Sequence, residues 1–176
     1  MEIKEIKKQF SIFETNPSLV YLDSAASTQT PRVVVQAMNA YYEKYRANVH
    51  RGLYPLSEVA TDAYEAARST VADFIEAKPN EIIFTSGATH GLNILAYSLC
   101  KNLKPEDNVV ITEMEHHANF VPWQEMSKRY GFELRFVPVS KELEYRLNLD
   151  KAKLLIDEHT KIVAFAGVSN VLGSVN

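Results

Sequence analysis

Thr89 and its neighbours are the first residues whose types and spacing could do chemistry. The run from Ile82 to Gly91 is typical of an apolar strand, a turn at Gly87 and the start of a helix. The first N–H groups of a helix lack partners inside it, and the helix dipole favours an anion there. With the Thr89 hydroxyl as a further donor, phosphate is the natural ligand, although a purely structural turn explains the same pattern. The spacing matches neither a P-loop nor a dinucleotide fingerprint.

Two adjacent histidines lie in a second polar run, Glu113–Asn119. This run follows a predicted strand, and the ligands of open α/β sheets bind beyond the carboxyl ends of strands. We therefore expect His116 and His117 on the phosphate side, where an imidazole can stack on an aromatic ring or move a proton. No metal site is expected, because one backbone rarely aims adjacent histidines at one ion and the H-E-x-x-H spacing is absent.

Three further side chains suit a ligand but suit ordinary loops equally well. His50 and Arg51 lie in the polar loop 48–56, where the planar guanidinium of arginine can bind a carboxylate or a phosphate. Asn170 follows the last predicted strand and can form a hydrogen bond to a ligand or occupy a plain turn. Cys100 lies late in an apolar helix without a nearby base, so we interpret it as a core side chain.

The elements that must position these residues alternate between strands and helices. The pattern predicts strands at 20–22, 82–84, 109–111, 134–139 and 162–166, and helices at about 3–13, 31–45, 57–76, 88–99, 123–130 and 148–158, with Ser57 as a helix cap and Gly131 as a helix stop. Short apolar strands separated by helices predict an α/β fold with a mainly parallel sheet covered by helices. Residues 1–16 are expected to form an N-terminal helical arm.

The overall composition excludes several classes of protein. The 176 residues carry 19 basic and 22 acidic side chains, and a net charge of −3 offers no footprint for nucleic acid or an anionic membrane. The apolar runs are too short to span a bilayer, and the N-terminus lacks the apolar core of a signal peptide. A single cysteine excludes an internal disulfide and a multi-cysteine zinc site. We expect a cytoplasmic protein without nucleic-acid or membrane partners.

Five short motifs follow one another in a specific order. They are Tyr-Leu-Asp-Ser-Ala-Ala-Ser at 21–27, Val-His-Arg-Gly at 49–52, Thr-Ser-Gly-Ala-Thr at 85–89, Glu-His-His-Ala-Asn at 115–119 and Ser-Asn-Val-Leu-Gly at 169–173. Together they resemble class V aminotransferases, and specifically the Suf-type cysteine desulfurases, from about residue 20 to the end. The resemblance implies the type I fold of pyridoxal 5′-phosphate (PLP) enzymes, a homodimer, and 17–176 as the N-terminal part of the PLP-binding large domain.

The resemblance implies cofactor contacts at four matching positions. Ala88 and Thr89 match the phosphate-binding turn of the family. His116 matches a catalytic histidine that stacks on the pyridine ring of PLP and takes part in proton transfer, and Asn170 matches the residue that bonds the ring hydroxyl. One departure is His90, which stands where the Suf-type pattern usually has glutamate, so the contacts of that acid are not implied here.

The resemblance also implies a substrate and an interface. Ala25 and Ala26 match a small-residue loop beside the substrate, and His50 and Arg51 match a loop near the active site at the dimer interface. The implied reaction converts L-cysteine to L-alanine and transfers sulfur to an enzyme cysteine, for iron–sulfur cluster assembly or another sulfur-acceptor protein. The alternatives are L-selenocysteine as the substrate, or another class V activity such as a selenocysteine lyase, an aminotransferase, an epimerase or a kynureninase-like hydrolase.

Several catalytic groups of the family cannot be mapped onto residues 1–176. They are the Schiff-base lysine, the nucleophilic cysteine, the aspartate that bonds the pyridine nitrogen and the arginine that binds the substrate carboxylate. We therefore expect a truncated N-terminal portion that is inactive and poorly soluble by itself. The alternatives are an engineered or proteolytic piece, half of a split enzyme, or a non-catalytic module that binds phosphate or PLP.

Overall fold

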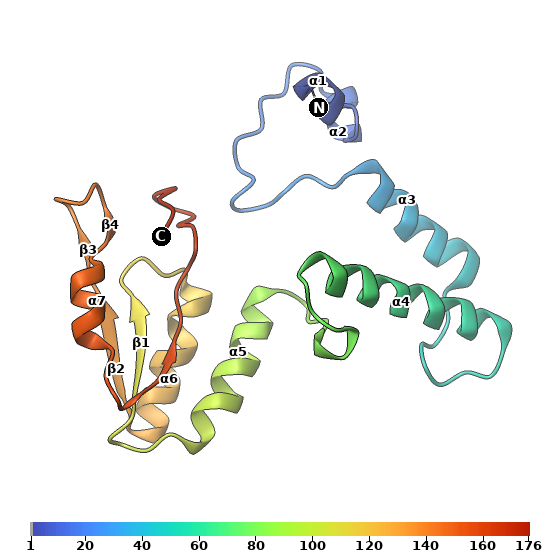
Figure 1. The fold of residues 1–176 in the computed structure, drawn as a ribbon. Helices are drawn as coiled ribbons and strands as arrows, with labels where there is room; N and C mark the ends of the chain where they lie inside the picture. Colours follow the sequence, from blue (N-terminus) through green and yellow to red (C-terminus); the bar gives the residue numbers. More distant parts are fainter. Residues whose placement is uncertain (1) are drawn as a thin grey trace. The chain divides into compact units, whose positions relative to one another are not determined.

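A computed structural model describes residues 2–176 and divides them into two compact units, one that ends at Ile83 and one that comprises Phe84–Asn176 (Figure 1). The first unit is helical. Its elements are α1 (Ile3–Lys7), α2 (Ser11–Thr15), α3 (Arg32–Ala40), the π-helical turn η1 (Tyr41–Tyr45), α4 (Pro55–Phe74) and the 3-10 turn η2 (Pro79–Glu81). The single helix expected over 3–13 is therefore two short helices, and the arm expected at 1–16 stays a prediction about domain organisation.

Several expected elements of this part of the chain are wrong. Residues 20–22 form no strand, and Val20 and Leu22 are mostly exposed, because a strand needs a paired neighbour and the described part of this unit offers none there. Residues 82–84 also lie outside any strand. Ser57 does not cap α4, because Pro55 begins the helix and the Ser57 hydroxyl instead donates to the carbonyl oxygen of Asn48 at 2.6 Å.

The second unit is built on a three-stranded parallel sheet in the order β2–β1–β5. Its strands are β1 (Asn108–Thr112), β2 (Glu133–Val137) and β5 (Thr160–Val163), and a two-stranded hairpin consists of β3 (Val139–Ser140) and β4 (Arg146–Leu147). Its helices are α5 (Ala88–Leu99), α6 (Val121–Tyr130) and α7 (Leu149–Leu155), with 3-10 turns η3 (Cys100–Asn102) and η4 (His117–Asn119).

The central strand β1 is buried along its whole length and organises the core. Successive side chains of a strand point to opposite faces. Val109 and Ile111 pack with α5 and α6, where the Trp123 side chain is also buried, whereas Val110 packs with Leu147 and α7 on the other face. Helices therefore cover both faces of the sheet, as Figure 1 shows. The predicted α/β fold with a parallel sheet covered by helices is confirmed.

A polar network ties the amino ends of the strands together. Asn108 is fully buried at the start of β1; its amide donates to Asp157 at 2.9 Å, and its oxygen accepts from the Thr160 hydroxyl at 2.8 Å. Arg135 of β2 donates to the Asp157 carboxylate at 2.6 Å and to the Leu155 carbonyl oxygen at 2.9 Å. Both carboxylate oxygens of Asp157 therefore accept hydrogen bonds. The polar loops lie at the opposite, carboxyl ends of the strands.

Within residues 2–176, none of the helices combines the length and apolar character needed to cross a bilayer.

Candidate functional site

The first residues of α5 follow a glycine turn that borders open space. Gly87 is the N-cap of the helix and has φ 152°, and a Cβ built on it would meet nothing within 4 Å. The Thr85 hydroxyl donates to the Gly87 carbonyl oxygen at 3.0 Å and so shapes the turn. Ala88 and Thr89 are the first two residues of α5, where N–H groups have no partner inside the helix. An anion can approach this backbone without a steric barrier at Gly87.

His90 closes the same turn from the helix side. Its Nδ1 accepts from the Ser86 N–H at 3.3 Å and lies 3.1 Å from the Ser86 hydroxyl oxygen. An imidazole that accepts at Nδ1 carries its proton at Nε2 when it is neutral. His90 therefore supplies an acceptor to the turn.

His116 lies in the loop that follows β1 and caps the 3-10 turn η4. Its Nδ1 accepts from the Ala118 N–H at 3.1 Å, so the neutral ring carries its proton at Nε2. The ring is exposed and stands edge-on to the His117 ring, with centroids 6.1 Å apart. The loop thus holds the imidazole by one nitrogen while the side chain stays exposed.

Thr89 and His116 line one hollow of about 300 Å³, together with Asn93, His117, Ala118, Val121 and Pro122. This volume lies at the lower end of the roughly 300–1,000 Å³ of small-molecule pockets. The hollow brings together a residue of the proposed phosphate turn and the proposed ring-stacking histidine. Ala88 and Asn170 are not among the residues that line it.

Asn170 is exposed in a tight turn after β5. The turn is closed by Ser169, whose N–H donates to the Ser174 carbonyl oxygen at 3.0 Å and whose own carbonyl oxygen accepts from the Gly173 N–H at 2.9 Å. Because β1 and β5 are parallel neighbours, the loops with His116 and Asn170 follow the same edge of the sheet. The role of Asn170 in a ligand site stays a prediction.

Glu115 joins these two loops, although its place in the sequence predicted no role for it. Its Oε1 accepts from the Ala166 N–H at 2.9 Å, and its Oε2 accepts from the Asn119 amide at 2.7 Å. The contact with Ala166 spans 51 positions, so no local pattern could have predicted it.

The two alanines predicted beside the substrate lie in the first unit, in a turn at 24–26. The Asp23 carbonyl oxygen accepts from the N–H groups of Ala26 and Ser27 at 3.2 and 3.0 Å. The Tyr21 hydroxyl donates to the Ser27 carbonyl oxygen and closes the loop. Ala25 and Ala26 are both exposed, and their place beside a substrate stays a prediction.

His50 lies in the first unit and is held in an unusual backbone conformation, with φ 69°. Its N–H donates to the Thr61 hydroxyl at 3.0 Å, and its Nε2 lies 2.7 Å from Glu65 Oε1. This hydrogen bond, with help from Arg68, lowers the pKa of the Glu65 carboxyl below its ordinary value. Arg51 is exposed beside it. The site roles of both residues stay predictions.

Cys100 is fully buried in the core beneath α5 and α6, as the sequence predicts. Burial raises the pKa of its thiol to about 11, which is unfavourable for a nucleophile because the thiolate is the reactive form. No group of three or more His, Cys, Asp or Glu side chains in residues 2–176 could hold a metal ion.

The family model for class-V aminotransferases matches residues 20–176. The chain belongs to the class-V aminotransferase family. A probable cysteine desulfurase of this kind from Staphylococcus epidermidis is 50% identical over 98% of the chain and 42% of its own length. The chain thus spans about 42% of the length of the curated relatives it matches.

Two solved cysteine desulfurases are similar to this class-V chain in structure. The apo enzyme from Thermococcus onnurineus NA1 gives a TM-score of 0.91 at 40% identity, over 99% of this chain and 42% of that one. The enzyme CsdA from Escherichia coli gives 0.83 at 31% identity, over 99% and 43%. Cysteine desulfurases of the class-V family are PLP-dependent, and the likeness confirms the expected fold of PLP-dependent transferases.

Proposed function

We propose that the chain supplies the N-terminal, cofactor-binding part of a PLP-dependent cysteine desulfurase, which converts L-cysteine to L-alanine and transfers the sulfur to a cysteine thiol. The observation that carries this proposal is that Thr89 and His116 line the same hollow. It joins the start of a helix, which favours a phosphate, to an imidazole, which can stack on an aromatic ring. The relatives at 50% and 46% identity are named as probable cysteine desulfurases, which supports the reaction.

The donors around the hollow fit PLP. The first N–H groups of α5 and the Thr89 hydroxyl would hold the phosphate, and the open space at Gly87 would let it approach. His116 would lie against the pyridine ring, and its Nε2 would hold or move a proton. When bound, PLP supplies an electron sink for the carbanion that forms at the α-carbon of an amino acid. The protein's own contribution is therefore to bind the phosphate, orient the ring and place one proton carrier.

The proposal extends to the assembly in which the site would work. His50 and Arg51 would lie near the active site at a homodimer interface, Ala25 and Ala26 beside the substrate, and Asn170 at the ring hydroxyl. The sulfur would pass to an acceptor protein in the cytoplasm. These assignments rest on the motifs at matching positions and on the class-V family of the chain.

Binding of pyridoxine 5′-phosphate tests the cofactor site directly. This analogue keeps the ring and the phosphate but lacks the aldehyde, so it cannot react with surface lysines. We expect the 176-residue chain to bind it in a calorimetric titration. T89V should weaken binding by about tenfold or more, because a hydrogen bond to a charged group contributes about 1.5–3 kcal/mol.

The matched control is T70V, which removes the hydroxyl of an exposed threonine in α4 that donates to the Ala66 carbonyl oxygen of its own helix. T70V should leave the affinity unchanged. Absence of binding by the unmodified chain, or equal losses in T89V and T70V, would contradict the proposal.

A further inference from the structure

We propose that Glu115 is a positioning residue that holds two cofactor loops, one with His116 and one with Asn170, at a fixed separation. This inference rests on the proposed function and deepens it. It starts from the fact that His116 and Asn170 lie in different loops, after β1 and after β5. Two contacts to one ring require these loops to keep a fixed separation.

The carboxylate of Glu115 contacts both loops and the end of β1. Its Oε1 accepts from the Thr112 hydroxyl at 2.5 Å, and Thr112 is the buried last residue of β1. The same oxygen accepts from the Ala166 N–H at 2.9 Å, in the segment that leads from β5 to the turn with Asn170. Glu115 Oε1 therefore fixes the segment that leads to Asn170 to the end of β1.

The other oxygen fixes the loop of His116. Glu115 Oε2 accepts from the Asn119 amide at 2.7 Å, and the Asn119 side-chain oxygen accepts from the Trp123 indole N–H at 2.9 Å. Trp123 is buried in the core, so this chain of hydrogen bonds anchors η4 to α6. The Asn119 N–H also donates to the His116 carbonyl oxygen at 2.8 Å, which places His116 inside the anchored turn.

The chemistry of these contacts requires a carboxylate. All three partners donate, and an ionised carboxylate accepts at both oxygens without a donor of its own. A glutamine would turn its NH₂ toward the Asn119 NH₂, or toward Thr112 and Ala166. The Asn119 amide cannot flip to answer this without losing its bond to Trp123. Position 115 therefore needs two acceptors, and position 119 needs a donor toward Glu115 and an acceptor toward Trp123.

Amide hydrogen exchange tests the inference without any ligand. In E115A we expect the Ala166 N–H to exchange about tenfold faster or more, because it loses a charge-assisted hydrogen bond, which is about twice as strong as a neutral one. We expect the same of the Ala118 N–H, because it lies in the turn that Glu115 anchors. The matched control is E113A, which removes a carboxylate from the same loop that accepts from the Val139 N–H at 2.9 Å. E113A should leave Ala166 and Ala118 unchanged. Unchanged exchange at Ala166 in E115A would overturn the inference.

A reciprocal exchange of side chains separates the network from a general loss of stability. E115Q alone should accelerate exchange of the Ala166 and Ala118 N–H groups. E115Q combined with N119D should return both exchange rates to within about twofold of those in the unmodified chain, because the double variant restores a donor–acceptor pair between positions 115 and 119. The introduced glutamine then donates to the introduced aspartate, and that aspartate can still accept from the Trp123 indole N–H. If the double variant exchanges as fast as E115Q, the inference is wrong.

Pyridoxine 5′-phosphate affinity completes the test and keeps the two hypotheses distinguishable. If Glu115 positions both loops, H116A and N170A should each weaken binding in the unmodified chain and have little further effect in E115A. Equal effects in both backgrounds would overturn the inference while the proposed function stands. Absence of binding by the unmodified chain would instead count against the proposed function, and the exchange rates would still decide the role of Glu115.

Discussion

The thiol of Cys100 shows how burial decides the chemistry of a residue. Cys100 is the chain's single cysteine, and burial raises the pKa of its thiol to about 11. At neutral pH almost none of it is thiolate, and the side chain has no exposed surface for a reagent to reach. We expect no reaction with Ellman's reagent in the folded chain and one equivalent after unfolding in guanidinium chloride. Stoichiometric reaction of the folded chain would contradict this prediction.

The same thiol cannot accept sulfur from a substrate. We therefore expect the 176-residue chain, supplied with PLP and L-cysteine, to release no alanine, and C100A to behave identically. The missing lysine and cysteine motifs predict the same outcome from the sequence, and the buried thiol gives it a physical reason.

At the scale of single elements, Gly131 ends α6 through its backbone conformation. It has φ 81°, and its N–H donates to the Ser127 carbonyl oxygen at 2.8 Å. A side chain at this φ is strained, so G131A should lower the free energy of unfolding by about 1 kcal/mol. The matched control is G167A, at a glycine without a positive φ and with open space at its Cβ. Equal urea midpoints for G131A and G167A would contradict the prediction.

The elements that the sequence predicted best are those with local signals. Helix α5 begins and ends as expected, and Gly131 stops α6 as expected. The wrong strands at 20–22 and 82–84 have apolar runs of the right length, but a strand forms only where a neighbour pairs with it. The β3–β4 hairpin was missed because its turn places Glu144 and Tyr145 at positive φ, where glycine or asparagine is the usual signal. The bridge from Glu115 to Ala166 depends on strand order, which no local pattern encodes.

The network at Asp157 links elements through one charge. Hydrogen bonds from Arg135, and then from Asn108, lower the pKa of the Asp157 carboxyl below its ordinary 3.8. The folded chain thus binds this proton less tightly than the unfolded chain does. The carboxylate therefore stabilises the fold above pH 3.8, and this contribution is lost as the pH falls through the lower, folded-state value.

We expect D157N to be less stable than the unmodified chain at pH 7, and the difference to shrink steadily below pH 3.8. Urea unfolding at a series of pH values, followed by circular dichroism, measures the difference directly. The loss arises because an amide at this position offers an NH₂ to a guanidinium that needs an acceptor. A difference that stays constant from pH 7 to the acid limit of folding would contradict this assignment.

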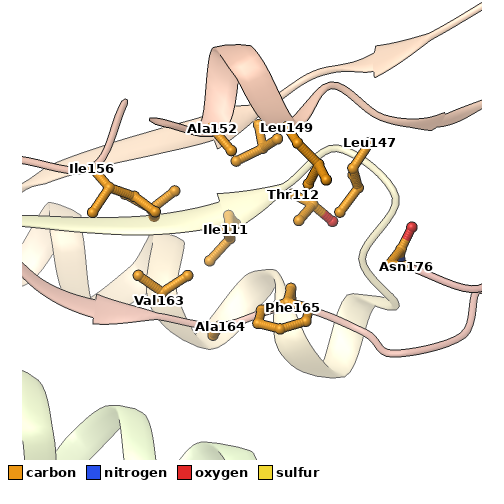
Figure 2. Close-up of a pocket in the computed structure, with 12 residues that line it drawn as sticks. Ile111, Thr112, Leu147, Leu149, Ala152, Ile156, Val163, Ala164, Phe165 and Asn176 are labelled. Carbon is orange, nitrogen blue, oxygen red and sulfur yellow. The ribbon is translucent and has the colours of Figure 1, made fainter. Parts of the chain in front are cut away.

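At the scale of the whole molecule, the class-V relatives are more than twice as long as the chain, and the second unit exposes an apolar edge. Among the described residues, β5 has one neighbour in the sheet, β1. Beside this edge lies an apolar hollow of about 200 Å³, with Val163, Ala164 and Phe165 on one side and residues of α7 on the other (Figure 2). Exposed strand edges next to apolar surface favour pairing with other chains.

We therefore expect the 176-residue chain to self-associate, with a sedimentation coefficient that rises with concentration. F165K should reduce this association, because it places a charge at the hollow just after β5, where a strand from another chain would have to bury it. The matched control is L154K in α7, because Leu154 is 77% exposed against 57% for Phe165 yet does not line the hollow. If exposure alone drove association, L154K would reduce it more than F165K does. If the open edge and its hollow drive it, F165K has the larger effect, and an F165K effect no larger than that of L154K would contradict this assignment.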